Sequence, residues 1–229
     1  MKIVSIAFIV FTLALLGFST YQALVVAPTE QTMGDVQRIF YYHVPSAWVA
    51  GVCFLVNFLA SIAYLAKRSR NADAMAAASA EVGVVFCTVV LITGPIWARP
   101  VWGIWWTWDA RLTTTLVLWL IYVSYLVLRR FAAGSQTQVL AAVLGIFGFV
   151  DVPIVYMSIR WFRTQHPSPV MGGGQNSGLD PAMLHAFLWN LLAFTCVGIV
   201  LIAVRFRLQK MENQLEAKHA DLALQGGSR

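Results

Sequence analysis

The chain has 229 residues, of which 59% are apolar and only 11% are charged, and its formal net charge is +6. An average soluble domain is about 25% charged, so a water-soluble globule of this length could not cover its surface with so few charges. The composition therefore excludes soluble, disordered and nucleic-acid-binding proteins, and it predicts an all-α integral membrane protein.

Six apolar segments follow one another along the chain. A bilayer core of about 30 Å requires roughly 20 apolar residues per helix. Six segments meet that length: 3–27, 44–66, 76–97, 113–131, 138–158 and 182–204. The first segment is longer than a signal-peptide core and lacks a small-residue cleavage site, so we interpret it as an uncleaved anchor.

The basic residues predict the topology of these spans. Eleven of the sixteen lysines and arginines fall on the side that carries both termini. By the positive-inside rule, both termini are cytoplasmic. In a bacterium, this places the chain in the inner membrane with the segments 28–43, 98–112 and 159–181 facing the periplasm.

The chain is divided into a six-helix transmembrane domain, 1–206, and a cytoplasmic C-terminal tail, 207–229. In the tail, Leu208, Met211 and Leu215 follow helical spacing. This pattern is typical of a short amphipathic helix that could contact a partner, although a solvated tail explains it equally well.

The nine tryptophans are distributed on one side only. On the six-span map, each lies in an outer loop or in the outer half of a helix, whereas an ordinary aromatic belt marks both interfaces. Five of them gather in the loop 97–113: Trp97, Trp102, Trp105, Trp106 and Trp108. Such a group of indoles predicts a platform for a large, planar, apolar ligand.

Two arginines, Arg99 and Arg111, stand beside this platform. Guanidinium groups are natural partners for carboxylates, so we expect these side chains to contact the propionates of a bound ligand. Haem is such a ligand, because it is flat and apolar and carries two negatively charged propionates. A quinone would not require the arginines.

Three histidines, His43, His166 and His185, are expected near the outer face. A single histidine at a helix end is usually just a hydrogen-bonded polar residue, but two imidazoles can bind a haem iron from opposite faces. His43 is the first choice. His166 and His185 compete for the second position, with His166 favoured because a loop ligand can move aside to release its cargo.

Two acidic residues also stand out. Asp109 precedes a predicted helix and is expected to act as its N-cap, or else to contact a partner or an indole N–H. Asp151 lies inside the fifth span, where an acid is by default a candidate functional residue. The alternative is a protonated acid bonded to a neighbouring helix, with Asn57 as its candidate partner, or to backbone carbonyls freed by Pro153.

Other chemistries have little support. Cys53, Cys87 and Cys196 lie singly in apolar runs, so we expect buried free thiols. The sequence contains no phosphate-binding loop, hydrolytic triad or metal-ligand cluster, and we expect no enzymatic activity.

The run Trp102-Gly-Ile-Trp-Trp-Thr-Trp-Asp-Ala-Arg-Leu-Thr113 resembles the WWD signature of the haem-handling proteins of cytochrome c biogenesis. Within that superfamily, the chain resembles the cytochrome c maturation protein C family, also called haem exporter protein C. The similarity extends to His-Val-Pro at 43–45 and to Asp-Pro-Ala-Met at 180–183. The resemblance implies that His43 and His166 are axial ligands of haem b, and that Asp109 belongs to the tryptophan platform.

The resemblance also implies a function in transfer rather than catalysis. Such a protein holds haem b at the periplasmic face and presents it to the haem chaperone, cytochrome c maturation protein E. Its partners would be the ABC transporter subunits (cytochrome c maturation proteins A and B), the small single-span protein D and membrane lipid, but no nucleic acid. The alternatives are a cytochrome b or quinol oxidoreductase subunit, which usually holds histidine pairs inside its helices, and a permease that moves haem itself.

Overall fold

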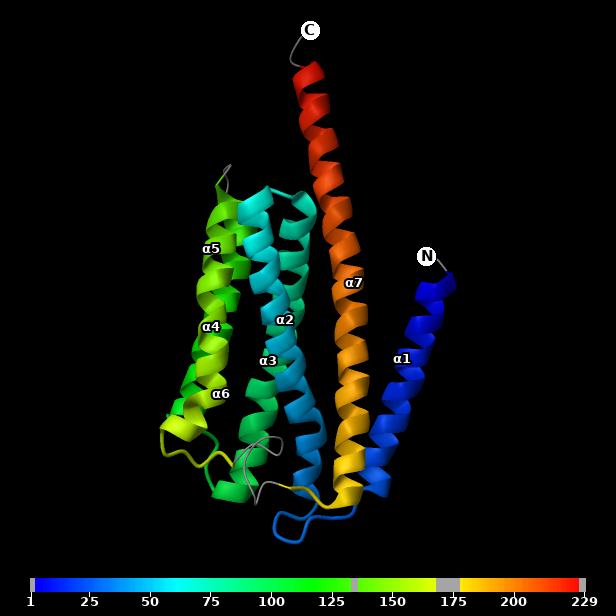
Figure 1. Cartoon of the computed structure of the whole chain (residues 1–229), viewed down its shortest axis with the longest axis vertical. Coiled ribbons are helices and arrows are strands. Elements are labelled where there is room, and N and C mark those ends of the chain that lie inside the picture. Colours follow the sequence, from blue (N-terminus) through cyan, green and yellow to red (C-terminus); the bar gives the residue numbers. More distant parts are fainter. Residues whose placement is uncertain (1–2, 133–135, 168–177, 227–229) are drawn as a thin grey trace.

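The computed structural model describes residues 3–132, 136–167 and 178–226. These residues form a bundle in which six helical segments are long and apolar enough to cross a membrane (Figure 1). The prediction of an all-α protein with six spans is therefore confirmed. The α-helices are α1 (Ile3–Tyr21), α2 (Phe40–Lys67), α3 (Arg70–Trp102), α4 (Ala110–Phe131), α5 (Thr137–Phe149), α6 (Asp151–Trp161) and α7 (Pro181–Gly226).

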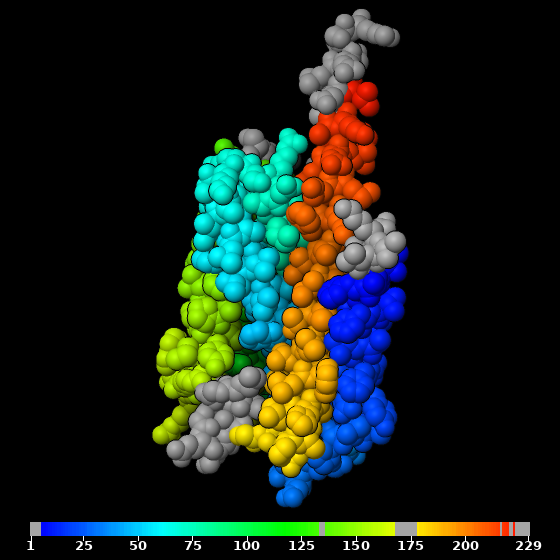
Figure 2. Space-filling view, turned by 45° about the vertical axis from the view of Figure 1, so that its right-hand side comes forward, coloured from blue at the N-terminus to red at the C-terminus, as the bar shows by residue number. Residues whose placement is uncertain are grey.

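Helix α2 is the centre of the bundle and packs against α3, α5 and α7, whereas α4 packs against α3, α5 and α6. Figure 2 shows α1 lying along α7, with α2 and α3 on the other side of α7. Phe54 of α2 stacks on Tyr122 of α4 with their ring centroids 3.8 Å apart. Gly83 of α3 lies against the same Phe54 ring, where a Cβ would come within 2.5 Å of it, so the core depends on small residues at this contact.

Buried asparagines link the helices. Asn57 of α2 donates to the carbonyl of Ala76 at 2.8 Å, and Asn190 of α7 donates to the carbonyl of Ser19 at 2.9 Å. Hydrogen bonds of this kind hold helices together where the solvent is lipid. The candidate pairing of Asn57 with Asp151 is wrong: Asn57 donates to Ala76 instead, and Asp151 Oδ2 has no hydrogen-bond partner among the described residues.

The third span is longer than the sequence predicted. Helix α3 begins at Arg70 rather than 76, since the alanine-rich start is a good helix former and most of its alanines are buried. It ends at Trp102, where Gly103 adopts the left-handed conformation with φ of 79° that commonly terminates helices. Trp97, Arg99 and Trp102 therefore lie on a helix rather than in the outer loop.

The fifth span is broken into α5 and α6. Helix α5 ends at Phe149 and α6 begins at Asp151. Pro153 cannot donate the backbone hydrogen bond that the carbonyl of Phe149 would accept in a continuous helix. Asp151 thus lies at the start of a helix, and its Oδ2 has no hydrogen-bond partner among the described residues.

Helix α7 continues far beyond the other helices at the end where α2 meets α3 (Figure 1). Its 46 residues correspond to about 69 Å at 1.5 Å per residue. The C-terminal segment is therefore helical as far as Gly226, and the boundary at 206 falls inside α7. The three cysteines are buried free thiols, as predicted.

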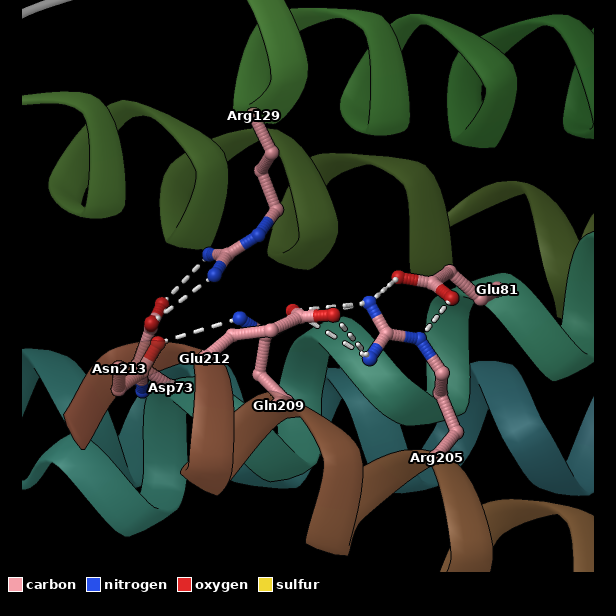
Figure 3. A network of polar contacts seen from close by, with 7 residues as sticks. All are labelled: Asp73, Glu81, Arg129, Arg205, Gln209, Glu212 and Asn213. Atoms are coloured by element: carbon pink, nitrogen blue, oxygen red, sulfur yellow. Dashed lines mark hydrogen bonds and ion pairs between the residues drawn. The ribbon is translucent and has the colours of Figure 1, made fainter. Parts of the chain in front are cut away.

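Two ion-pair groups tie α3 to α4 and to α7 at this same end (Figure 3). Arg129 binds Asp73 through both guanidinium nitrogens, at 2.5 and 2.9 Å. Arg205 binds both carboxylate oxygens of Glu81 and also contacts Glu212 at 3.4 Å. The position at which α7 leaves the bundle is therefore held by charge-assisted hydrogen bonds.

Candidate functional site

The candidate site lies at the opposite end of the bundle, which we call the outer end. Here α2 and α4 begin, and α3 and α6 end. Four parts of the chain meet there: the first turns of α2, the last turns of α3, the loop between α3 and α4, and the segment after α6. The tertiary structure thus brings together His43, the tryptophan run and His166, which are far apart in the sequence.

His43 is the fourth residue of α2, at the end of its first turn, rather than in a loop before the helix, and it is only 9% exposed. Its ring contacts the indole of Trp97 edge to face, with 5.9 Å between the centroids. The ring Nδ1 lies 2.8 Å from the hydroxyl oxygen of Thr93. That hydroxyl donates its hydrogen to the carbonyl of Val89 at 2.7 Å, so the oxygen accepts from His43.

This arrangement selects the tautomer of His43. Because Nδ1 carries the hydrogen, Nε2 of the neutral ring has a free lone pair. Metal-binding histidines almost always donate their second ring N–H to an oxygen acceptor, which orients the ring. Thr93 is such an acceptor, and no pattern in the sequence marks it for this role.

His166 follows α6 and is half-buried. Its Nδ1 lies 2.9 Å from the carbonyl oxygen of Pro167, which can only accept, so here too Nε2 keeps the lone pair. Burial, together with the nearby charge of Arg111, lowers the pKa of this imidazole below its ordinary value. The ring is therefore neutral at pH 7, which is the state that binds a metal.

Both imidazoles lie at the outer end: His43 contacts Trp97 of α3, and Thr164, two residues before His166, donates to Asp109 of the tryptophan loop. His185 does not join them. It lies on the exposed face of α7, whereas its neighbours Met183, Ala186 and Phe187 turn into the core. The geometry therefore groups His43 with His166 and leaves His185 apart.

The tryptophans divide into a half-buried and an exposed set. Trp105 and Trp108 are 59% and 75% exposed, and Trp106 packs edge to face on Trp108 at 5.7 Å. The indole N–H groups of Trp97 and Trp106 are buried, and neither has a hydrogen-bond partner in the described part of the chain. Buried donors usually have a partner, so these two are available to a bound ligand with acceptor oxygens.

The two arginines contact backbone carbonyls in this structure. Arg111 donates to the carbonyls of Val155 and Tyr156 on α6, at 2.7 and 3.3 Å, and Arg99 donates to the carbonyl of Gly103. Arg99 is exposed and can turn toward a ligand, whereas Arg111 joins α4 to α6. The propionate contacts expected from the sequence are thus not preformed.

Asp109 is the N-cap of α4, as predicted, because its Oδ1 accepts from the backbone N–H of Leu112 at 3.0 Å. Its Oδ2 accepts from the hydroxyls of Thr107 and Thr164, each at 3.1 Å. Thr164 belongs to the segment after α6, so Asp109 also joins the tryptophan loop to the part of the chain that carries His166. No pattern in the sequence marks Thr164 for this contact.

Comparison with known proteins gives a consistent picture. The family model described as "Heme exporter protein C" matches residues 1–221. A protein of Bradyrhizobium diazoefficiens with the same name is 37% identical over 206 residues, which cover 89% of this chain and 76% of that protein. Its Escherichia coli counterpart is 34% identical over 188 residues, covering 79% and 73%. A mitochondrial protein of Marchantia polymorpha, named for cytochrome c biosynthesis, is 30% identical over 189 residues, covering 82% and 80%.

Proposed function

Because the chain belongs to the heme exporter protein C family, we propose that it binds haem b at the outer membrane face and presents it to a haem chaperone during the biogenesis of c-type cytochromes. Family membership supports the broader role in haem export and cytochrome c biogenesis. It also supports a haem-handling rather than a catalytic activity. Haem is thus the cargo of this protein.

The observation that carries the proposal is the tautomer that the two outer histidines have in common. Both His43 and His166 engage Nδ1 with an oxygen acceptor, and both therefore offer an Nε2 lone pair to iron. One ligand comes from a rigid helix and the other from the segment after α6. We therefore propose His43 as the fixed axial ligand and His166 as the ligand that leaves when haem is passed on.

The tryptophans would cover the haem around this axis. Trp97 touches the His43 ring, and the unpaired indole N–H groups of Trp97 and Trp106 can donate to propionate oxygens. Trp102, Trp105 and Trp108 would extend the apolar surface, and the exposed Arg99 can add a charged contact. The large exposed area of Trp108, 75%, suits a surface from which cargo is collected by a partner.

The proposed topology follows the charge distribution. Both termini are cytoplasmic in this proposal, so the outer end faces the periplasm of a bacterial inner membrane. The partners are the haem chaperone (cytochrome c maturation protein E), the ABC transporter subunits (proteins A and B) and the small single-span protein D. Residues 1–206 form the haem-handling domain, and the tail 207–229, in which α7 continues as far as Gly226, lies in the cytoplasm.

An electron-transfer cytochrome b is the alternative from another class. Such a protein usually holds its histidine pairs inside its helices, on opposite sides of a buried haem. Here the candidate histidines lie at one end of the bundle. The site therefore favours presentation of haem at a surface over electron transfer across the membrane.

The test is the absorption spectrum of the detergent-purified protein, produced with its pathway partners but without the chaperone. We expect a Soret band with low-spin features in the wild type, lost or shifted in His43→Ala and in His166→Ala. His185→Ala is the matched control and should leave the spectrum unchanged. Absence of haem from the wild type, while the partners accumulate it, would refute the proposal.

A further inference from the structure

The segment that carries His166 is held in place by a chain of hydrogen bonds that begins at Asp109. The Thr164 hydroxyl donates to Asp109 Oδ2 at 3.1 Å. The same hydroxyl oxygen accepts the backbone N–H of His166 at 2.9 Å. Thr164 therefore uses its hydrogen toward the tryptophan loop and a lone pair toward the histidine backbone, and the two contacts are compatible.

Thr164 forms one hydrogen bond within its own segment and one with a distant part of the chain. The contact from Thr164 to the N–H two residues later is a turn of the kind that hydroxyl side chains commonly form. The contact to Asp109 spans 55 residues. The backbone at His166 is thus fixed relative to the loop that carries the tryptophans, and not only relative to the end of α6.

The Asp109 carboxylate is well suited to this role. Its Oδ1 accepts the N-cap hydrogen bond from the backbone N–H of Leu112. Its Oδ2 accepts a hydrogen bond from the hydroxyl of Thr107, in addition to the one from Thr164. The N-cap bond by itself orients the carboxylate, so Oδ2 faces Thr164 with or without the hydrogen bond from Thr107. A hollow of 390 Å³ opens beside this link, lined by Thr107, Asp109, Arg163, Thr164 and Gln165, so the link is reachable from the outer surface.

We propose that Asp109 and Thr164 are positioning residues for the second axial ligand, and that their hydrogen bond determines when His166 leaves the iron. This inference rests on the proposed function. His43 sits on a helix with its own acceptor, Thr93, and does not depend on the link. Breaking the link therefore frees His166 alone, and His166 is the ligand that leaves first when haem is transferred.

The test uses the full-length protein in detergent, reconstituted with haem b. Thr164→Val removes the hydroxyl without changing the size of the side chain, and Thr164→Ser restores it. Thr107→Val is the matched control, since it removes a hydrogen bond to the same Asp109 oxygen but none to His166. Each variant is compared by its spin state and by the rate at which excess apomyoglobin takes up its haem.

We expect Thr164→Val to convert the low-spin spectrum into that of five-coordinate haem on His43, as His166→Ala does, and to speed haem loss by ~10-fold, the lower end of the effect of removing a partner of a ligating histidine. Thr164→Ser and Thr107→Val should retain the wild-type spectrum. If Thr164→Val does not fold, Asp109→Ser keeps an N-cap hydroxyl but has no second oxygen to accept the Thr164 hydroxyl hydrogen, and it should give the same change.

A Thr164→Val protein with the wild-type spectrum and haem-loss rate would overturn the positioning role while the proposed function stood. An equal change in Thr107→Val would also overturn it, because the effect would then belong to the loop as a whole. A wild-type protein that binds no haem would instead refute the proposed function, and the positioning role with it.

Discussion

Replacing Thr93 with valine tests whether the tautomer of His43 matters for haem binding. The change keeps the volume of the side chain but removes the oxygen that lies 2.8 Å from Nδ1. His43 is 9% exposed, so water cannot readily replace this acceptor. Loss of the partner of a metal-ligating histidine typically lowers metal affinity 10- to 100-fold, which corresponds to about 1.4–2.8 kcal/mol.

The assay is a titration of the apoprotein in detergent with haem, followed by the Soret absorbance. Thr93→Val should raise the Kd by the stated ~10- to 100-fold, and Thr93→Ser should stay near the wild type because it restores the hydroxyl. The low-spin features should weaken in the valine variant, since the ring is no longer held in the orientation that presents Nε2.

Helix α3 offers a matched control at Thr88. Its hydroxyl likewise donates to the carbonyl four residues earlier, at 2.7 Å, and accepts a ring N–H, that of Trp119, at 2.8 Å. Thr88→Val therefore loses the same kind of hydrogen bond without touching a histidine, and it should leave the Kd unchanged. A folded Thr93→Val protein with a Kd within about twofold of wild type, far below the expected 10-fold, would refute the reasoning.

Three further predictions follow from other contacts. Arg129→Ala should lower the free energy of unfolding by about 3 kcal/mol, because it leaves the largely buried carboxylate of Asp73 without its ion-pair partner, and thermal unfolding in detergent measures this. Gly145→Ala should destabilise the protein by about 1–3 kcal/mol, since the new Cβ would overlap Asn57 Oδ1, and the same unfolding assay measures the loss. Burial and nearby Arg111 lower the pKa of His166, so a proton competes with iron for this ring only below the ordinary histidine range. The low-spin spectrum should therefore persist as the pH falls through about 6.5 and disappear at lower pH. A pH titration of that spectrum measures this.

Each of these has a control. An additional Asp73→Asn change should recover part of the stability lost in Arg129→Ala, because it removes the unpaired charge; a double variant as unstable as the single one would contradict this. Gly17→Ala adds a Cβ where no atom lies within 4 Å and should be tolerated, unlike Gly145→Ala. A low-spin spectrum that disappears with a midpoint above about pH 6.5 would contradict a neutral, buried His166.

Several properties followed from the sequence because they depend on local or additive quantities. Hydropathy summed over windows of about 20 residues predicted the six spans, and the one-sided tryptophans identified the outer end. The N-cap role of Asp109 was also predictable, since capping involves only the next three residues. The predicted start of α3 was wrong because Arg70, Asn71 and Asp73 lower the hydropathy of a stretch that the neighbouring alanines still favour as helix.

The remaining features depend on contacts between distant parts of the chain. Thr93 lies 50 residues from His43, and Thr164 lies 55 residues from Asp109, and no local pattern distinguishes these threonines from the others. The separation of His166 from His185 likewise depends on which face of α7 packs into the bundle. The sequence by itself thus determined the membrane class, the spans and the residue types of the site. Only the tertiary structure decided which hydroxyl meets which ring nitrogen, because a hydrogen bond requires atoms within about 3 Å, and packing alone sets such distances.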